Sequence, residues 1–427
     1  MIAIGGIIGA GLFVGSSTTI NAVGPAAVLS YMIAGTIILL VMRMLSEMAM
    51  AVPGVQSFPE FAREGLGPLA GFLSGWLYWY FWVVVVAIEA IAGAKIIQEW
   101  LPRFAVWEIG VALMALLTAV NLLSARSYGE FEFWFSAIKV AAIVAFIALA
   151  GAWAFGLTSP HGPTFGNLVS HDGFVPNGRA AVLAGSASTI FALCGAEIAT
   201  IAAAESREPT KVIARMGLTV TLRILIFYVL AIILIVAVVP WTEIAPGHSP
   251  FAAALAKMDY PFVDMIMKAV ILVAVLSCLN SGLYVTSRAL FGLARHGDAP
   301  GWLVTLSKRR VPARAILVAS LFSYGALGAS RLYENVFSAL VNASGAVMLF
   351  LYLMVAAAQL KLRAKYEVLA PGRLQIRMWF HPFATLFAIM AMLAVLLFMA
   401  LNPELRPQFL ASVWVTAGFA AIWMGRK

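Results

Sequence analysis

The chain has 427 residues, of which 63% are hydrophobic and 11% are charged, and its formal net charge is +9. Soluble globular domains are about half apolar and about one quarter charged, so this composition excludes a soluble protein and indicates lipid around most of the chain. With two cysteines and no motif of metal-ligand spacing, the sequence predicts no disulfide framework, metal site or cofactor.

Apolar segments that are long enough to span a bilayer recur along the whole chain. Twelve are predicted, over residues 1–22, 26–50, 69–97, 105–123, 131–155, 181–203, 217–240, 262–291, 314–330, 335–359, 381–401 and 408–425. The first lacks a basic leader, so we expect no cleavable signal peptide. The sequence therefore predicts an all-α integral membrane protein of about 12 transmembrane helices, with 1–427 as a single domain.

The basic residues are distributed unevenly over the loops between these segments. Most of the 28 lysines and arginines fall in one set of alternate loops, which the positive-inside rule assigns to the cytoplasm. Both termini are then cytoplasmic in a multi-pass inner-membrane protein. The excess positive charge indicates topology, and we expect the lipid bilayer and no nucleic acid among the partners.

The first segment contains a cluster of glycines that has two interpretations. Gly5 and Gly9, like Gly11 and Gly15, have the GxxxG spacing of close helix packing. The glycines also scatter over several helix faces, which favours an unwound turn at Gly9-Ala10-Gly11. The N–H groups that such a turn frees, together with the helix dipole, suit a carboxylate.

Two carboxylates and one lysine stand out inside the predicted spans. Glu89, in the third segment, is suited to bind an amine, relay protons or pair with a lysine. Lys139, in the fifth, lies about 16–18 Å from either end of its helix, too deep for its side chain to reach water. It must find partners or lose its proton, so we interpret it as a proton-coupling group, with a fixed ion pair to Glu89 or Glu197 as the alternative.

The sixth segment complements the first. An unwound turn at Gly195 would expose the carbonyl groups of Phe191, Ala192 and Leu193, which suit an ammonium group. Phe191 is either a gate over the ligand or an ordinary packing aromatic, and Glu197 is expected to hold the turn by accepting backbone N–H groups.

The eighth segment places Ser277, Asn280 and Ser281 on one helix face, where they can coordinate an ion or a lysine or bond to neighbouring helices. The first and sixth segments also suggest an internal repeat. They are five spans apart, and an odd number of spans inverts the orientation. We expect a first repeat over 1–155, a second over 181–359 and two additional helices over 381–427.

Several motifs together resemble the amino-acid transporter family of the amino acid–polyamine–organocation (APC) superfamily. They are GGIIGAGLFVGS (5–16), GPA (24–26), RMLSEMA (43–49), SGWLYWYFW (74–82), YGEFEFWFSAIKV (128–140), GAEIATIAAAES (195–206), SCLNSGLYVTSR (277–288) and GDAP (297–300). The match covers almost the whole chain, and within the family the likeness is greatest to the 4-aminobutyrate (GABA) permeases.

The resemblance implies a LeuT-like fold with a 5+5 inverted repeat, broken helices 1 and 6, and proton symport of amino acids. It implies that Gly9 and Gly11 bind the substrate carboxylate, that Phe191 is the aromatic gate, and that Lys139 stands where sodium-coupled relatives hold an ion, beside Asn280 and Ser281. The chain departs from the family in FALCGAE (191–197), where relatives commonly have an FSFxGxE-like run, in PGVQSF (53–58), which lacks the usual TGSF, and in its short beginning.

These observations predict a proton-coupled amino-acid permease that imports a small zwitterion, GABA-like or another neutral amino acid. An amino acid/amine exchanger and a non-transporting amino-acid sensor are the alternatives. An enzyme is not expected, because the sequence has no clustered nucleophile and base and no phosphate loop.

Overall fold

The computed structural model describes residues 7–52, 55, 57–123, 125–198, 209–260, 262–309, 311–332, 340 and 344–426, and within these ranges it contains helices and no strand. The predicted features at Gly5, Gly6 and residues 199–203 and 335–339 lie outside them. The helices are α2 (Ala10–Phe13), α3 (Gly15–Val23), α4 (Ala27–Ala51), α5 (Phe58–Leu66), α6 (Pro68–Trp100), α7 (Val106–Leu123), α8 (Ala125–Ala154), α9 (Gly178–Leu193), α11 (Pro209–Val238), α12 (Pro250–Lys257), α13 (Val263–Arg295), α14 (Ala313–Ser330), α16 (Val347–Leu369), α17 (Phe383–Leu401) and α18 (Arg406–Gly425).

Each of the twelve predicted segments overlaps at least one of these helices. Nine helical stretches of the described chain are long and apolar enough to cross a membrane, and one of them, Ala10–Ala51, covers the first two predicted segments. The apolar helices Gly178–Leu193 and Leu225–Val238 are shorter. The structure therefore agrees with a multi-pass helical membrane protein, while helix length alone does not fix the number of spans.

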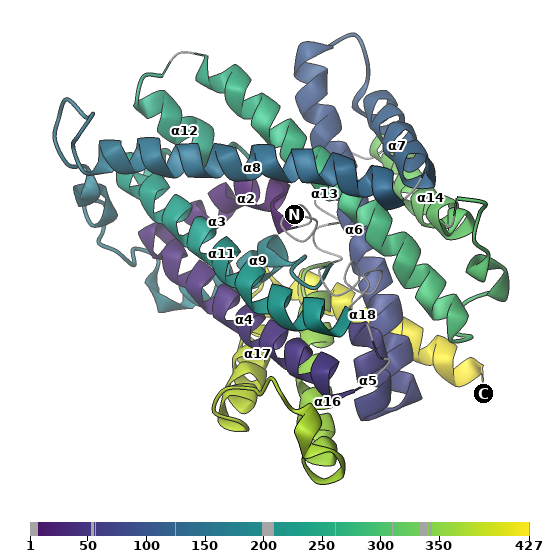
Figure 1. Cartoon of the computed structure of the whole chain (residues 1–427). Coiled ribbons are helices and arrows are strands. Elements are labelled where there is room, and N and C mark those ends of the chain that lie inside the picture. The colour runs from purple at the N-terminus through teal and green to yellow at the C-terminus, as the bar shows by residue number, and fades with distance from the viewer. Residues whose placement is uncertain are drawn as a thin grey trace.

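Helices that lie five predicted segments apart in the sequence pack against each other. Four of the first five predicted segments contact the segment that lies five places later: α3 packs on α9, α4 on α11, α6 on α13, and α7 on α14. Figure 1 shows α8 as a long helix that runs across the molecule past α11 and α13, both of which it contacts.

Glycines bring these paired helices close together. An added Cβ would meet Leu225 of α11 at Gly35, Val275 of α13 at Gly93, Leu327 of α14 at Gly110, and Val23 of α3 at Gly185. Without a hydrophobic force between helices in lipid, close backbone approach of this kind is what holds them together. Part of the glycine content is thus explained by packing.

A buried ion pair joins α4 to α16 at one end of the molecule. Arg363 donates to Glu47 at 2.6 Å, and the two side chains are 7% and 1% exposed. The Glu47 carboxylate also accepts from Gln359 at 2.7 Å and from the backbone N–H of Met378. One carboxylate therefore holds α16 and the segment before α17 against α4.

We predict that Glu47→Ala lowers the free energy of unfolding by about 3–5 kcal/mol, because it removes the buried partner of Arg363, Gln359 and the Met378 N–H and leaves Arg363 only the half-exposed Glu367. Thermal unfolding in detergent micelles measures the change. The matched control is Lys365→Ala. Lys365 lies on α16, like Arg363, and forms an ion pair with Glu64 of α5 in which the side chains are 45% and 40% exposed. The control should change little, since water screens exposed pairs. Equal losses in both variants would contradict this account of Glu47.

Candidate functional site

The first helix is interrupted close to its predicted position. Ile8 and Gly9 leave the helical conformation, Gly9 being extended with φ −132° and ψ −154°, and α2 begins at Ala10. The unwound turn expected at Gly9-Ala10-Gly11 thus lies one residue earlier, and Ala10 and Gly11 are already helical. A second irregularity at Val14 separates α2 from α3. The N–H groups of Ala10 and Gly11 therefore stand at the start of a short helix.

Neighbouring helices approach this break so closely that any larger residue would crowd them. A Cβ on Gly9 would lie 2.7 Å from Glu89 Oε1 and 3.0 Å from Cys278 Cβ. A Cβ on Gly11 would lie 3.1 Å from the Ala192 Cα of α9. The packing interpretation of these two glycines and the helix-break interpretation are therefore compatible.

The sixth segment is also interrupted. Helix α9 ends at Leu193, Cys194 is extended with ψ 147°, and the chain turns through Glu197. Gly195 has φ +121°, a conformation that side chains with a Cβ rarely adopt. This stretch departs from the helix within an otherwise apolar segment, so its peptide groups need other partners.

Glu197 supplies part of that support. Its Oε2 accepts the Gly195 N–H at 3.1 Å and the Tyr352 hydroxyl of α16 at 3.2 Å, and the side chain is 1% exposed. These contacts are those expected of a carboxylate that holds the turn.

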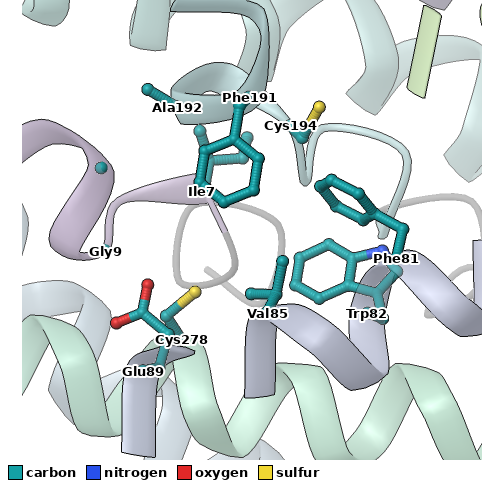
Figure 2. Close-up of a pocket in the computed structure, with 11 residues that line it drawn as sticks. Ile7, Gly9, Phe81, Trp82, Val85, Glu89, Phe191, Ala192, Cys194 and Cys278 are labelled. Carbon is teal, nitrogen blue, oxygen red and sulfur yellow. The ribbon is translucent and has the colours of Figure 1, made fainter. Parts of the chain in front are cut away.

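A cavity lies between the two breaks and encloses about 310 Å³ of empty volume, including the space at its mouth. Figure 2 shows Glu89 and Cys278 beneath Gly9, with Phe81 and Trp82 on the opposite side and Phe191 above. The lining residues come from the first break, α6, the end of α9, and α13; they are Ile7, Gly9, Gly11, Phe81, Trp82, Val85, Glu89, Phe191, Ala192, Cys194 and Cys278. The space that the surrounding side chains leave clear inside it is about 30 Å³, which is room for water, so the walls must separate further to admit a zwitterion.

The cavity brings together only part of the predicted ligand-binding set. Gly9, Gly11, Phe191 and Ala192 line it, whereas Ala10, Leu193 and Gly195 stand beside it. The Phe191 ring meets the Phe81 ring edge to face, with centroids 5.7 Å apart.

Sequence reasoning missed the aromatic wall that α6 contributes. Phe81, Val85 and Glu89 are spaced by four residues and so share one helix face with Trp82. The SGWLYWYFW motif (74–82) is aromatic, and its last two residues lie on the same helix face as the intramembrane carboxylate Glu89. That combination could have predicted an aromatic wall beside a polar site.

Glu89 already occupies part of the first break. The Ala10 N–H donates to Glu89 Oε1 at 3.3 Å, and the glutamate is 5% exposed. A protein carboxylate thus accepts one of the backbone donors that the sequence analysis assigns to a ligand carboxylate. The geometry shows that a carboxyl group fits at this donor.

Lys139 satisfies a carbonyl group that the same break releases. Its Nζ donates to the Ile8 oxygen at 2.8 Å, and the side chain is fully buried. It also interacts electrostatically with Glu89 and with Glu132. The protonation state of Lys139 is therefore linked by direct contact to the geometry of the first break.

Glu132 is a buried carboxylate that the sequence analysis overlooked. It lies two turns before Lys139 on α8 and has no exposed surface. Ser277 of α13 and Ser136 of α8 both donate to its Oε1, the latter at 3.1 Å, and Ser281 lies beside the same carboxyl group. Because it is the second residue of the predicted span 131–155, position alone suggested an end-of-helix residue.

The predicted polar face of α13 divides between two neighbours. Ser277 and Ser281 face Glu132, while the Asn280 oxygen accepts from Asn121 of α7 at 2.9 Å. All these side chains are buried. The face therefore contacts the carboxylate beside Lys139 and joins α13 to α7.

Tyr228 of α11 connects the two breaks. Its hydroxyl lies 3.0 Å from the Ile7 oxygen and 3.3 Å from the Ala192 oxygen, within donating distance of both. The side chain is fully buried. In the part of the chain that the structure describes, no group of three or more His, Cys, Asp or Glu side chains is arranged to hold a metal ion.

Comparison with known proteins gives consistent relatives. The family model of amino acid permeases matches residues 1–425. The chain is 44% identical to the gamma-aminobutyric acid permease of Bacillus subtilis, covering 97% of this chain and 89% of the relative. It is 45% identical to a probable GABA permease of Pseudomonas aeruginosa, over 97% and 88% of the two chains. It is 37% identical to the aromatic amino acid transport protein AroP of Corynebacterium glutamicum, over 99% and 92%.

The contacts of Gly9 yield a stability prediction. Gly9→Ala should destabilise the protein by about 1–3 kcal/mol, because the new methyl group collides with Glu89 and Cys278. Gly15→Ala is the control, since its Cβ would meet only the Ala10 oxygen at an ordinary 3.7 Å. Unfolding midpoints in detergent compare the two variants. If Gly9→Ala proved as stable as Gly15→Ala, the close approach at the break would be refuted.

Proposed function

The chain belongs to the amino acid permease family, and from this premise we propose that it imports a small zwitterionic amino acid across the inner membrane in symport with protons. GABA is the first candidate substrate, because two of the relatives are named for it. The observation that carries the proposal is the cavity between the two helix breaks.

The helix pairing supports the inverted repeat of the proposed twelve-span architecture, for which the charge distribution of the loops favours both termini in the cytoplasm. If 1–155 and 181–359 are inverted repeats related by a pseudo-two-fold axis, helices near that axis pack on their own counterparts. The pairs α3–α9, α4–α11, α6–α13 and α7–α14 follow that rule. The breaks at Gly9 and Gly195 then occupy equivalent places in the two repeats.

The first break is the proposed carboxylate site. The substrate carboxylate takes the Ala10 and Gly11 N–H groups at the positive end of α2. Glu89 now accepts the Ala10 N–H. Two carboxylates cannot share that donor without repulsion, so binding is favoured when Glu89 is protonated. A proton and a substrate carboxylate would thus enter together.

The second break is the proposed ammonium site. The Ala192 carbonyl lines the cavity wall, with the Tyr228 hydroxyl within donating distance. The substrate ammonium binds the Ala192 and Leu193 carbonyls, and the Phe81, Trp82 and Phe191 rings cover its carbon chain. Because Tyr228 contacts both breaks, the same hydroxyl senses both ends of the zwitterion.

Lys139 is the proposed proton-coupling group, with Asn280 and Ser281 on the adjoining α13 face. When ionised, it holds the Ile8 carbonyl at 2.8 Å. Loss of the proton removes that charge-assisted bond, which is stronger than a neutral one. The balance between outward-open and inward-open states therefore shifts with the proton.

We predict that purified protein in liposomes accumulates labelled GABA when the outside is made acidic, and that Lys139→Met abolishes this accumulation. The neutral side chain of similar length cannot carry a proton. Uptake that ignores the pH gradient and the substitution would reject coupling, while GABA counterflow with no pH-driven accumulation would point to an exchanger. Binding with neither activity would indicate a sensor.

A competition panel tests the substrate class. We expect excess GABA to compete most strongly, phenylalanine more weakly, and lysine and serine least. Trp82→Ala should raise the KM for GABA about tenfold, since stacking and cation–π contacts of a buried aromatic ring contribute about 1–2 kcal/mol. Trp76→Ala is the control, because Trp76 lies on α6 but not in the cavity lining. Unchanged affinity in Trp82→Ala would exclude the aromatic wall from the site.

A further inference from the structure

Three charged side chains meet around the first break, and they are not balanced. The charges of Glu89 and Glu132 both act on Lys139, which is hydrogen-bonded to the Ile8 carbonyl of the break. All three are buried. With every group ionised the set would carry one uncompensated negative charge in a water-poor interior, which is strongly unfavourable. One carboxyl group must therefore hold a proton whenever the three are closed off from water.

The three groups also follow one another in space. Glu89 lines the cavity. Lys139 lies beyond it, and Glu132 is two turns nearer the start of α8. The loop before α8 is cytoplasmic by the charge distribution of the chain. Along α8, Glu132 thus lies between Lys139 and the cytoplasmic end of the helix.

Glu132 is held as a proton-accepting group would be. Ser277 and Ser136 fix its Oε1, while Oε2 has no hydrogen-bond partner among the residues that the structure describes. The side chain is oriented by one oxygen and the other remains available. An asparagine or a serine could make the same hydrogen bonds between helices. A buried carboxyl group is more costly than either, which indicates a function that needs an ionisable group.

The remaining titratable groups nearby come from two packed helices. Cys278 of α13 interacts with Glu89 and Glu132, Tyr228 of α11 interacts with Glu89, and both side chains are buried. Helices α7 and α12 also contact α8. Their described charged side chains are Glu108, in the first turn of α7, and Lys257, in the last turn of α12, and both lie at the end of the helix bundle opposite to Glu132. Lys139 is therefore the described cation that faces Glu132.

We propose that Glu132 is the exit residue of a proton path that begins at Glu89 in the cavity wall and passes through Lys139. In the first step the Lys139 ammonium gives a proton to the Glu132 carboxylate. In the second, the Glu89 O–H bond breaks and its proton forms an N–H bond on the neutral Lys139 amine, so that the three groups together stay uncharged. In the third, the Glu132 O–H bond breaks and its proton passes to cytoplasmic water. Each step moves one proton and leaves its electron pair behind, and the scheme rests on the proton symport proposed above.

The test compares Glu132→Gln with Glu130→Gln, which changes an exposed glutamate on the same turn of α8. Glutamine retains an oxygen for Ser277 and Ser136 but cannot accept a proton. The variants are reconstituted in liposomes that contain a pH-sensitive dye. GABA counterflow without a gradient reports folding and substrate binding, and lumen acidification on GABA entry reports proton movement.

We expect Glu132→Gln to keep counterflow within about twofold of the unmodified protein, yet to lose most of the roughly tenfold accumulation that one pH unit can drive. Its acidification signal should fall in parallel. Glu132→Asp should restore part of both signals, and Glu130→Gln should retain them.

Two results would overturn the role of Glu132. One is full accumulation and acidification in Glu132→Gln. The other is loss of counterflow in both Glu132→Gln and Glu132→Asp, which would assign the residue to packing. If the unmodified protein shows counterflow but no acidification, proton symport itself fails and the path fails with it. Absence of counterflow in the unmodified protein would instead remove the permease proposal.

Discussion

Every part of the site depends on one constraint: a peptide group inside a bilayer must have a hydrogen-bond partner. The first and sixth helices each give up regular winding, and the protein meets the resulting demand with side chains from other helices. Lys139 takes the Ile8 carbonyl, Glu89 takes the Ala10 N–H, and Glu197 takes the Gly195 N–H. These partners are ionisable, so the geometry of the breaks depends on where protons reside.

The same arrangement explains how a small ligand can influence large helices. The cavity is bounded by α6 and α13 on one side and by the ends of α2 and α9 on the other. Gly9 and Gly11 allow these elements to approach almost to backbone contact. A ligand placed there would exchange contacts with both groups at once. A few hydrogen bonds can therefore bias the relative position of two packed bodies, provided that each body moves as a unit.

The sequence predicted the helices, the two breaks and the isolated lysine because each leaves a local signature in apolar sequence. It placed the first break one residue late, because glycine composition indicates freedom to unwind and not which residue leaves the helix. Glu132 and Trp82 were missed for a different reason. Their importance arises from α13 and α9 packing beside them, and no window of α8 or α6 alone contains that information. The seven-residue spacing from Lys139 places Glu132 on the same face of α8, but only its contact with α13 shows that it is buried.

Helix α16 links the centre of the molecule with its edge. Tyr352 bonds Glu197 at the second break, and Arg363, three turns further along the same face, bonds Glu47. The two contacts are separated by about 16 Å of unbroken helix. Such a rod cannot bend locally without losing its own hydrogen bonds. If α16 tilts at the Glu197 turn, its opposite end at Glu47 must therefore be displaced. At that end the Glu47 carboxylate also accepts the Met378 N–H of the segment that leads into α17.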